Sequence, residues 1–331
     1  MDLEYSPIPE RAFHALEGFP TAFRQDIEDD VDRFRHVPPR SADSNGKVEV
    51  LHGVEMTHHF MQAPGESESQ PIAWHYVEAG KGEPVVLLHG IPDSWYVWNH
   101  QIAALSKTHR AIAVDLKGYG QSEKRPGDFR HEVVAEQLLA LLDTIGIDSF
   151  NMVTHDRGTV QGDWLAATHP DRVLRYCRGE QHLYHFNLAL APHENLFKGD
   201  GTEIARDPVR LVVLGYRWLC ARPVPDQDIE RTIQEYSYPE VAQAVMRYFN
   251  SSTFHKEWID RRTNLLNAWT CPILILQGFY SRTQPREWYE NARQYIPSAR
   301  DVRVRYIDAG HFWPLENPQE TTQALRHFLN S

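Results

Sequence analysis

The segment from Asn151 to Thr159 constrains the fold more than any other part of the chain. It reads Asn-Met-Val-Thr-His-Asp-Arg-Gly-Thr, so an apolar strand signal runs directly into Asp156 and then into the start of a helix. In the GxSxG elbow, a sharp turn of this kind presents a serine nucleophile. A carboxylate at the same place attacks saturated carbon and forms an ester with the substrate. Asp156 is therefore the candidate nucleophile, although an aspartate that only caps the following helix is an alternative.

Short apolar runs alternate with helical patterns on both sides of this turn. The alternating order predicts a mostly parallel, doubly wound sheet with its functional site at the carboxyl ends of the strands. Before it, residues 48–60 and 72–78 alternate like antiparallel strands, and the pair His58–His59 is expected to be an exposed strand feature. The predicted parallel strands cover residues 84–88, 111–114, 150–153, 174–179, 272–276 and 302–307, and the helices between the first of them cover 98–105 and 133–142.

Two segments with helical spacing lie outside this predicted core. Residues 1–48 are expected to form an N-terminal helical extension. Residues 184–262 are rich in aromatic residues, which predicts a helical cap inserted over the carboxyl edge of the sheet. The core then consists of residues 49–183 and 263–331. The extension either wraps this core or packs on a second copy of the chain, so a homodimer is one of the expected arrangements.

The composition excludes several classes of partner. A formal charge of -11 and a pI near 5.9 disfavour nucleic acid and anionic membranes, because neither attracts an acidic surface. The chain has no run of about 18 apolar residues, so no membrane span is predicted. Its three cysteines are widely spaced, which favours free thiols in a reducing, cytoplasmic compartment, and its N-terminus lacks the pattern of a signal peptide. A small molecule is the expected substrate.

Four motifs, in the same order along the chain, resemble those of the α/β-hydrolase superfamily and, within it, the epoxide hydrolases and the haloalkane and haloacetate dehalogenases. They are His-Gly-Ile-Pro-Asp-Ser-Trp from His89, the Gly-Tyr-Gly-Gln-Ser shortly after Asp115, the turn at Asp156, and Asp-Ala-Gly-His-Phe from Asp308. The resemblance covers roughly residues 70–331. It implies an α/β-hydrolase fold with an inserted helical cap, an aspartate nucleophile, and chemistry that needs no cofactor and no metal.

The same resemblance assigns roles in a two-step hydrolysis. His311 follows the last predicted strand and takes the place of the general base that activates water against the ester. The acidic partner of this base occurs in one of two places in the family. One place is the loop after the predicted strand 272–276, where this chain has Ser281, which is not an acid. The partner is therefore expected at the other place, the end of the strand after the elbow helix, which is Glu180. A different acid, such as Asp308, is the alternative.

The residues expected at the oxyanion hole help to identify the substrate class. The backbone N–H groups of Ile91 and Arg157 are expected to form this hole. At these two positions haloalkane dehalogenases carry asparagine and tryptophan, whose side chains bind the departing halide. This chain has Ile91 and Arg157 instead, which disfavours ordinary haloalkanes as substrates. Arg157 resembles the elbow of fluoroacetate dehalogenases, but Val160 stands where their second arginine would be. Arg157 therefore either holds an acidic substrate or makes a salt bridge.

Two tyrosines in the predicted cap favour an epoxide as substrate. Epoxide opening needs hydrogen-bond donors opposite the nucleophile, and Tyr216 and Tyr248 match the places in which epoxide hydrolases carry them. We therefore predict an epoxide hydrolase. The alternatives are a hydrolytic dehalogenase of the haloacid type and a repurposed non-hydrolytic protein on the same fold. The pocket for a largely apolar substrate is expected from Trp95, Tyr184, Trp218 and Phe312.

Overall fold

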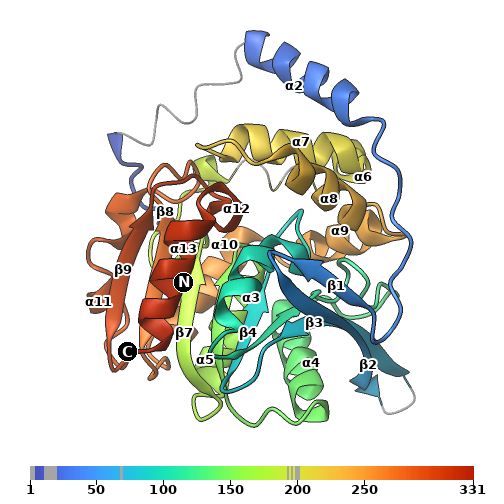
Figure 1. Cartoon of the computed structure of the whole chain (residues 1–331). Helices are drawn as coiled ribbons and strands as arrows, with labels where there is room; N and C mark the ends of the chain where they lie inside the picture. The colour runs from blue at the N-terminus through green and yellow to red at the C-terminus, as the bar shows by residue number, and fades with distance from the viewer. Residues whose placement is uncertain (1–3, 11–20, 68–69, 192–193, 195–196, 198–201) are drawn as a thin grey trace.

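One mixed β-sheet runs through the molecule and organises the other elements around it (Figure 1). The computed structural model of the chain describes all residues except 1–3, 11–20, 68–69, 192–193, 195–196 and 198–201. The strands of the described part are β1 (Val48–Leu51), β2 (Val54–Ser67), β3 (Gln70–Ala79), β4 (Pro84–Leu88), β5 (Arg110–Val114), β6 (Phe150–His155), β7 (Val173–Gly179), β8 (Ile273–Gly278) and β9 (Val302–Ile307).

The order of the strands confirms the predicted fold class. They lie in the order β1-β2-β3-β5-β4-β6-β7-β8-β9. The pairs β1/β2, β2/β3 and β3/β5 are antiparallel, whereas all the remaining pairs are parallel. An antiparallel edge on an otherwise parallel, doubly wound sheet is the architecture that the alternating strand and helix signals predicted.

The central parallel strands are buried on both faces. Every residue of β6 and β8 is buried. Burial along the whole strand is typical of parallel strands that helices cover on both sides. The polar residues of β6 find hydrogen-bond partners inside the protein; they are Asn151, Thr154 and His155. The elbow therefore starts from a strand that packing holds in place.

Helices connect the parallel strands and cover the sheet. In α4 the buried residues Val134, Leu138, Leu141 and Leu142 fall on one face of the helix. Among the described residues, no helix is both long enough and apolar enough to pass through a bilayer. The helices and short helical turns of this layer are Trp95–Trp98, α3 (Asn99–Leu105), α4 (His131–Thr144), α5 (Arg157–Thr168), Leu188–Leu190, Arg286–Tyr289, α11 (Ala292–Tyr295), α12 (Trp313–Glu316) and α13 (Pro318–Leu329).

Between β7 and β8 the chain leaves the sheet and forms a group of helices, yellow to orange in Figure 1. The longest of them, α7, begins at Pro208, and the preceding Asp207 accepts a hydrogen bond from the Arg210 N–H at 3.2 Å, which is a favourable helix start. The group consists of α6 (Thr202–Arg206), α7 (Pro208–Leu219), α8 (Asp226–Tyr236), α9 (Val241–Ser251), α10 (Phe254–Asp260) and the π-helical turn Arg261–Leu265. We refer to it as the cap.

The described part of the N-terminal extension packs on the cap of its own chain. Its helix α2 (Thr21–Phe34) lies along α7 (Figure 1). The charged side chains that join the extension to α7 and α8 are partly exposed, so each ion pair adds little stability. The pairs are Arg33–Asp226, Arg35–Asp207, Arg210–Glu28 and Arg217–Asp30. The apolar residues Phe13, Leu16 and Phe19, which contributed to the helical prediction for this extension, lie outside the described residues.

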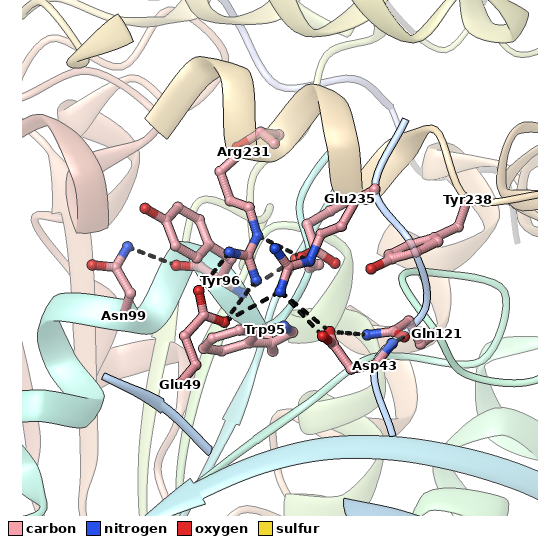
Figure 2. Close-up of polar contacts among 12 residues, drawn as sticks. Asp43, Glu49, Trp95, Tyr96, Asn99, Gln121, Arg231, Glu235 and Tyr238 are labelled. Carbon is pink, nitrogen blue, oxygen red and sulfur yellow. Dashed lines mark hydrogen bonds and ion pairs between the residues drawn. The ribbon is translucent and has the colours of Figure 1, made fainter. Parts of the chain in front are cut away.

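A cluster of charges joins α8 to the N-terminal extension and to β1 (Figure 2). Arg231 donates hydrogen bonds to Glu49 at 2.8 Å and to Glu235 at 2.7 Å. Arg40 donates to Asp43 at 3.1 Å and lies 3.5 Å from a Glu49 oxygen. We call these five residues the Arg231 cluster. The cluster joins the cap to the N-terminal extension and to β1.

Two histidines extend this cluster into the antiparallel strands. His58 is fully buried, and its ring nitrogens lie 3.0 Å from His75 and 3.3 Å from Glu49. His75 in turn contacts Asp115 at 2.7 Å. The prediction that the pair His58–His59 is exposed is therefore wrong for His58. Successive side chains of a strand point to opposite faces, so His58 faces inward and the partly exposed His59 faces outward.

Candidate active site

The elbow after β6 holds the candidate nucleophile in a strained turn. Asp156 has a φ of 47°, a conformation that residues other than glycine rarely adopt. Two glycines permit the close contacts around it. A Cβ on Gly158 would lie 2.5 Å from the His89 carbonyl oxygen, and a Cβ on Gly90 would lie 2.3 Å from the Asp156 Cβ. This tight packing presents the Asp156 side chain at the carboxyl edge of the sheet.

The Asp156 carboxylate is buried and kept in its charged form. Its Oδ1 accepts a hydrogen bond from the Ile91 N–H at 2.9 Å. Burial alone would raise the pKa of Asp156, but His311, His155 and the Ile91 N–H outweigh burial and hold the pKa below its usual value. The second oxygen, Oδ2, faces His311. An ionised carboxylate with one free oxygen is equipped to attack an electrophilic carbon.

His311 lies between this nucleophile and an acidic residue. Its Nδ1 is 3.0 Å from Glu180 Oε2, and its Nε2 is 3.7 Å from Asp156 Oδ2. Its backbone is fixed as well, because the His311 N–H donates to the Leu219 carbonyl at 2.9 Å and the His311 carbonyl accepts from His155 Nε2 at 2.7 Å. A separation of 3.7 Å is too long for a hydrogen bond, so Nε2 is available to a water molecule beside the nucleophile.

The charges around His311 favour its protonated form. Burial lowers the pKa of His311, but the hydrogen bond and charge of Glu180, together with the charge of Asp156, raise it above the ordinary value. A base that binds a proton more readily accepts one more readily from water. The same contact with Glu180 fixes the ring, since Nδ1–H donates to the carboxylate and leaves Nε2 as the acceptor.

Glu180 is itself held by the loop that contains the alternative acid position. Its Oε1 accepts from the Gly278 N–H at 2.7 Å, and its Oε2 accepts from the Ser281 hydroxyl at 2.7 Å. Ser281 therefore supports the acid instead of replacing it. Asp308, the other acid considered, is exposed and paired with Arg222. The structure thus brings Glu180, and not Asp308, to the base.

The Arg157 side chain forms an ion pair inside the protein. Its Nη1 and Nη2 each donate to one oxygen of Glu257 on α10, both at 2.8 Å, and both side chains are buried. The guanidinium also lies 5.2 Å from the centre of the Phe249 ring. Of the two roles predicted for this side chain, the salt bridge is the one that the geometry favours. Its backbone N–H begins α5, where N–H groups have no acceptor within the helix, so it is free to serve an oxyanion.

Tyr216 on α7 reaches the loop after β4. Its hydroxyl donates to Asp93 Oδ1 at 2.9 Å and lies 3.0 Å from the Thr232 hydroxyl, and its ring centre is 4.5 Å from that of Phe312. Burial raises the pKa of Asp93 to about 7, although the Tyr216 hydrogen bond opposes this shift. Asp93 was not among the predicted site residues. Its place in the motif after β4 was the one available signal, because Tyr216 is 123 positions away.

The second predicted donor, Tyr248, is turned toward the backbone. Its hydroxyl donates to the Lys117 carbonyl at 2.6 Å, and the side chain is buried. The ring lies against those of Tyr119 and Phe129, with centres 5.7 and 5.1 Å away. Tyr248 therefore borders the region of the site, but its hydroxyl is already engaged.

The predicted pocket residues divide into two groups. Phe312 packs on the catalytic region, with its ring centre 4.8 Å from that of His311. Trp218 is half-buried on α7. Tyr184 and Trp95 make their contacts elsewhere: Tyr184 stacks on a neighbouring tyrosine at 3.8 Å, and Trp95 lies beneath Arg231 (Figure 2).

Within the described part of the chain, no group of three or more histidine, cysteine, aspartate or glutamate side chains is arranged to hold a metal ion.

Comparison with known proteins agrees with this fold. Residues 83–177 match the alpha/beta hydrolase fold family. The chain is 38% identical over 287 residues to the soluble epoxide hydrolase of Corynebacterium sp. (strain C12), covering 80% of this chain and 94% of the relative. It is 25% identical over 272 residues to a haloalkane dehalogenase of Agrobacterium fabrum (strain C58 / ATCC 33970), covering 77% and 88%. A crystal structure of the Bacillus megaterium epoxide hydrolase with an inhibitor has a TM-score of 0.70 at 24% identity, covering 82% of this chain and all (100%) of that one, and shares its fold. The chain belongs to the epoxide hydrolase family of the α/β hydrolases.

Proposed function

We propose that this protein hydrolyses an epoxide to a vicinal diol through a covalent ester on Asp156. The observation that carries the proposal is the constellation of a buried, ionised carboxylate in the elbow, a histidine facing it, and Glu180 behind that histidine. The identity of 38% to a soluble epoxide hydrolase, against 25% to a haloalkane dehalogenase, supports an epoxide as the substrate.

In the first step, Asp156 Oδ2 attacks the less hindered carbon of the epoxide. Oδ1 bonds to the Ile91 N–H, so it becomes the carbonyl oxygen of the ester while Oδ2 is free to react. The carbon–oxygen bond of the ring breaks, and its electron pair stays on the oxygen. Tyr216 protonates this oxygen, and Asp93, with a pKa of about 7, holds a proton beside Tyr216 with which to restore the phenol.

In the second step, His311 removes a proton from water, and the resulting hydroxide attacks the carbonyl carbon of the ester. The charge that develops on Oδ1 is stabilised by the Ile91 N–H and by the free N–H of Arg157. Glu180 stabilises the imidazolium while it carries the proton. Collapse of the tetrahedral intermediate releases the diol, and the proton on His311 passes to the leaving alkoxide. The Asp156 carboxyl group then ionises, and its proton replaces the one that Asp93 gave to Tyr216, so the enzyme returns to its starting state.

A haloacid substrate is the weaker candidate on this geometry. A carboxylate-bearing substrate would need a positive charge in the site, but both Nη atoms of Arg157 are taken by Glu257. The neighbouring position one turn further along α5 is Val160, which offers no charge. A neutral substrate avoids placing a third charge in this buried region.

The test is to trap the ester in a His311→Gln variant, because loss of the base stops the second step and leaves the first intact. The variant is mixed with a panel of aryl and alkyl epoxides and haloacids, and its intact mass is measured. We expect a mass gain equal to the whole epoxide, mapped by peptide analysis to Asp156.

His59→Gln serves as a matched control, since His59 lies on β2 at the antiparallel edge of the sheet and carries no role in the mechanism. It should turn over epoxides at the wild-type rate without accumulating an adduct. A gain equal to the substrate minus hydrogen halide would establish the dehalogenase instead. Wild-type turnover of an epoxide without any trapped ester would contradict the covalent route.

A further inference from the structure

Tyr119 is a buried tyrosine beside the nucleophile for which the mechanism above has no use. It lies in the Gly-Tyr-Gly turn after β5, and it is 1% exposed. Both flanking glycines have positive φ, 92° for Gly118 and 47° for Gly120, so the turn fixes the direction of the side chain. The ring centre is 5.0 Å from that of His89, in the loop whose Gly90 packs on Asp156.

The hydroxyl group of Tyr119 has no hydrogen-bond partner among the described residues. An unpaired buried hydroxyl is unfavourable, and each one in a native protein calls for an explanation. Other buried polar atoms are unpaired too, for example the indole nitrogen of Trp74 on β3. Tyr119 differs from Trp74 because it lies among the charged groups of the active site.

The charges of four side chains act on this hydroxyl. Besides burial, which raises the pKa of Tyr119, the groups that act on it are Arg157, Asp156, Asp93 and Glu257. The hydroxyl therefore lies within electrostatic reach of the nucleophile itself. Two of these neighbours also have one polar atom without a partner in the described structure, the Nε of Arg157 and the Oδ2 of Asp93. Three buried polar atoms in this group of side chains thus lack a partner among the described residues, as expected where a polar ligand binds.

Of the other two tyrosines considered as donors, Tyr216 is the proton donor of the first step, and the hydroxyl hydrogen of Tyr248 is bound to a backbone carbonyl. Tyr216 donates to Asp93, and Tyr248 donates to the Lys117 carbonyl. Tyr119 is the phenol near the nucleophile whose hydrogen is not committed in this structure. A substrate oxygen that enters this space would satisfy it.

We propose that Tyr119 donates a hydrogen bond to the epoxide oxygen and serves, beside Tyr216, as the second donor in ring opening, the role that the sequence indicated for Tyr248. The inference rests on the proposed function. No bond to Tyr119 is formed or broken, because Tyr216 supplies the proton and Tyr119 stabilises the negative charge while it develops. The hydroxyl acts on the first step alone, since the oxygen is already an alcohol when water attacks the ester.

The decisive variant is Tyr119→Phe, which removes one oxygen atom that makes no hydrogen bond within the described protein. The midpoint of thermal unfolding should therefore stay at the wild-type value or rise. We expect the single-turnover rate of ester formation with an aryl epoxide to fall about 100-fold. The rate of hydrolysis of the preformed ester should stay within about twofold, and KM should change less than kcat.

Tyr236→Phe is the matched control, because the hydroxyl of this buried tyrosine on α8 is engaged with the Ala205 carbonyl at 3.1 Å and has no part in the mechanism. It should lower the unfolding midpoint and leave ester formation at the wild-type rate. Tyr248→Phe tests the competing assignment. If Tyr248→Phe slows ester formation and Tyr119→Phe does not, the inference is wrong.

A binding measurement separates this inference from the proposed function. A neutral aryl amide, whose carbonyl oxygen accepts the same hydrogen bonds without reacting, should bind Tyr119→Phe about tenfold more weakly than wild type. Unchanged ester formation and unchanged amide binding in Tyr119→Phe, with an active wild type, would overturn the inference and leave the proposed function standing. A wild type that forms no ester with any epoxide would overturn both.

Discussion

The Arg231 cluster and the group formed by Asp156, His311 and Glu180 are two buried polar networks that differ in how completely they are closed. Arg231 binds two carboxylates at 2.7 and 2.8 Å. His311 binds Glu180 at 3.0 Å but stands 3.7 Å from Asp156. Arg231 thus contacts both of its carboxylates directly, whereas the nucleophile and the base of the active site do not form a hydrogen bond with each other. The cluster still contains two atoms without a partner among the described residues, Arg40 Nε and one oxygen of Glu235. The cluster is therefore a network that stabilises the fold, and the active site is one in which a reactant can bind between two side chains.

The carboxyl groups of Glu49 and Asp93 show the same contrast, whereas burial raises the pKa of Glu235 within the cluster. In the cluster, hydrogen bonds and charge from His58 and Arg231 hold the pKa of Glu49 far below its usual value despite burial. Beside the active site, burial prevails at Asp93 and raises its pKa to about 7. A carboxyl group that titrates near neutrality exchanges protons under working conditions, and one that is fully paired does not. Variants in both networks test this distinction.

The largest effect is expected from Asp156→Asn. The amide oxygen still accepts the Ile91 hydrogen bond, so the elbow should fold, but the nucleophilic oxygen is lost. Epoxide turnover should fall by at least about 10⁴-fold. Product formation and intact mass are measured together, because deamidation would restore the aspartate. Activity in a sample without deamidation would show that Asp156 is not the nucleophile.

The next largest effect should appear in the other network, in Arg231→Met. Removal of the arginine leaves the buried carboxylate of Glu235 and the partly buried carboxylate of Glu49 without their nearest cation, which should lower the free energy of unfolding by about 3–5 kcal/mol. The kcat of the folded enzyme should stay within about threefold. Urea unfolding provides the measurement. Arg33→Met, which breaks an exposed pair between α2 and α8, is the control and should change stability by less than about 1 kcal/mol.

Glu180→Gln should weaken the second step and also shift its pH dependence. Glu180 raises the pKa of His311, so the substitution lowers that pKa and His311 stays neutral to lower pH. The acid limb of the ester hydrolysis rate should therefore move to lower pH, while the plateau falls by about 100-fold because the imidazolium is less stabilised. Single-turnover hydrolysis across pH measures both. An acid limb that does not move would show that another acid partners the base.

The smallest effect is expected from Asp93→Asn. The amide oxygen can still accept the Tyr216 hydrogen bond, but the group that titrates near pH 7 is gone. The rate of ester formation should fall about threefold at neutral pH. The inflection near pH 7 should disappear from its pH profile. An inflection that persists in the variant would assign that titration to a different group.

The sequence predicted the parts of this site that a strand end positions. Asp156, Glu180 and His311 each follow a predicted strand, and the carboxyl ends of neighbouring parallel strands meet at one edge. That rule is local, so periodicity and motif spacing were enough to find it. Glu180 was chosen because Ser281 occupies the other acid position, and its contact with His311 in the structure agrees with that choice.

Contacts that depend on the cap were beyond sequence reasoning. The pairing of Tyr216 with Asp93 and the ion pair of Arg157 with Glu257 join residues 123 and 100 positions apart. No periodic signal encodes such distances. The same limit applies to Tyr248, because its motif resemblance fixed a helix position but not the direction of its hydroxyl.

The hydrogen bond between Ser281 and Glu180 also has an evolutionary meaning. The serine on the loop after β8 and the glutamate after β7 meet at the same carboxylate oxygen that binds the histidine. The two positions at which related hydrolases carry this acid are therefore in direct contact here, and an acid at either one needs the histidine in the same place.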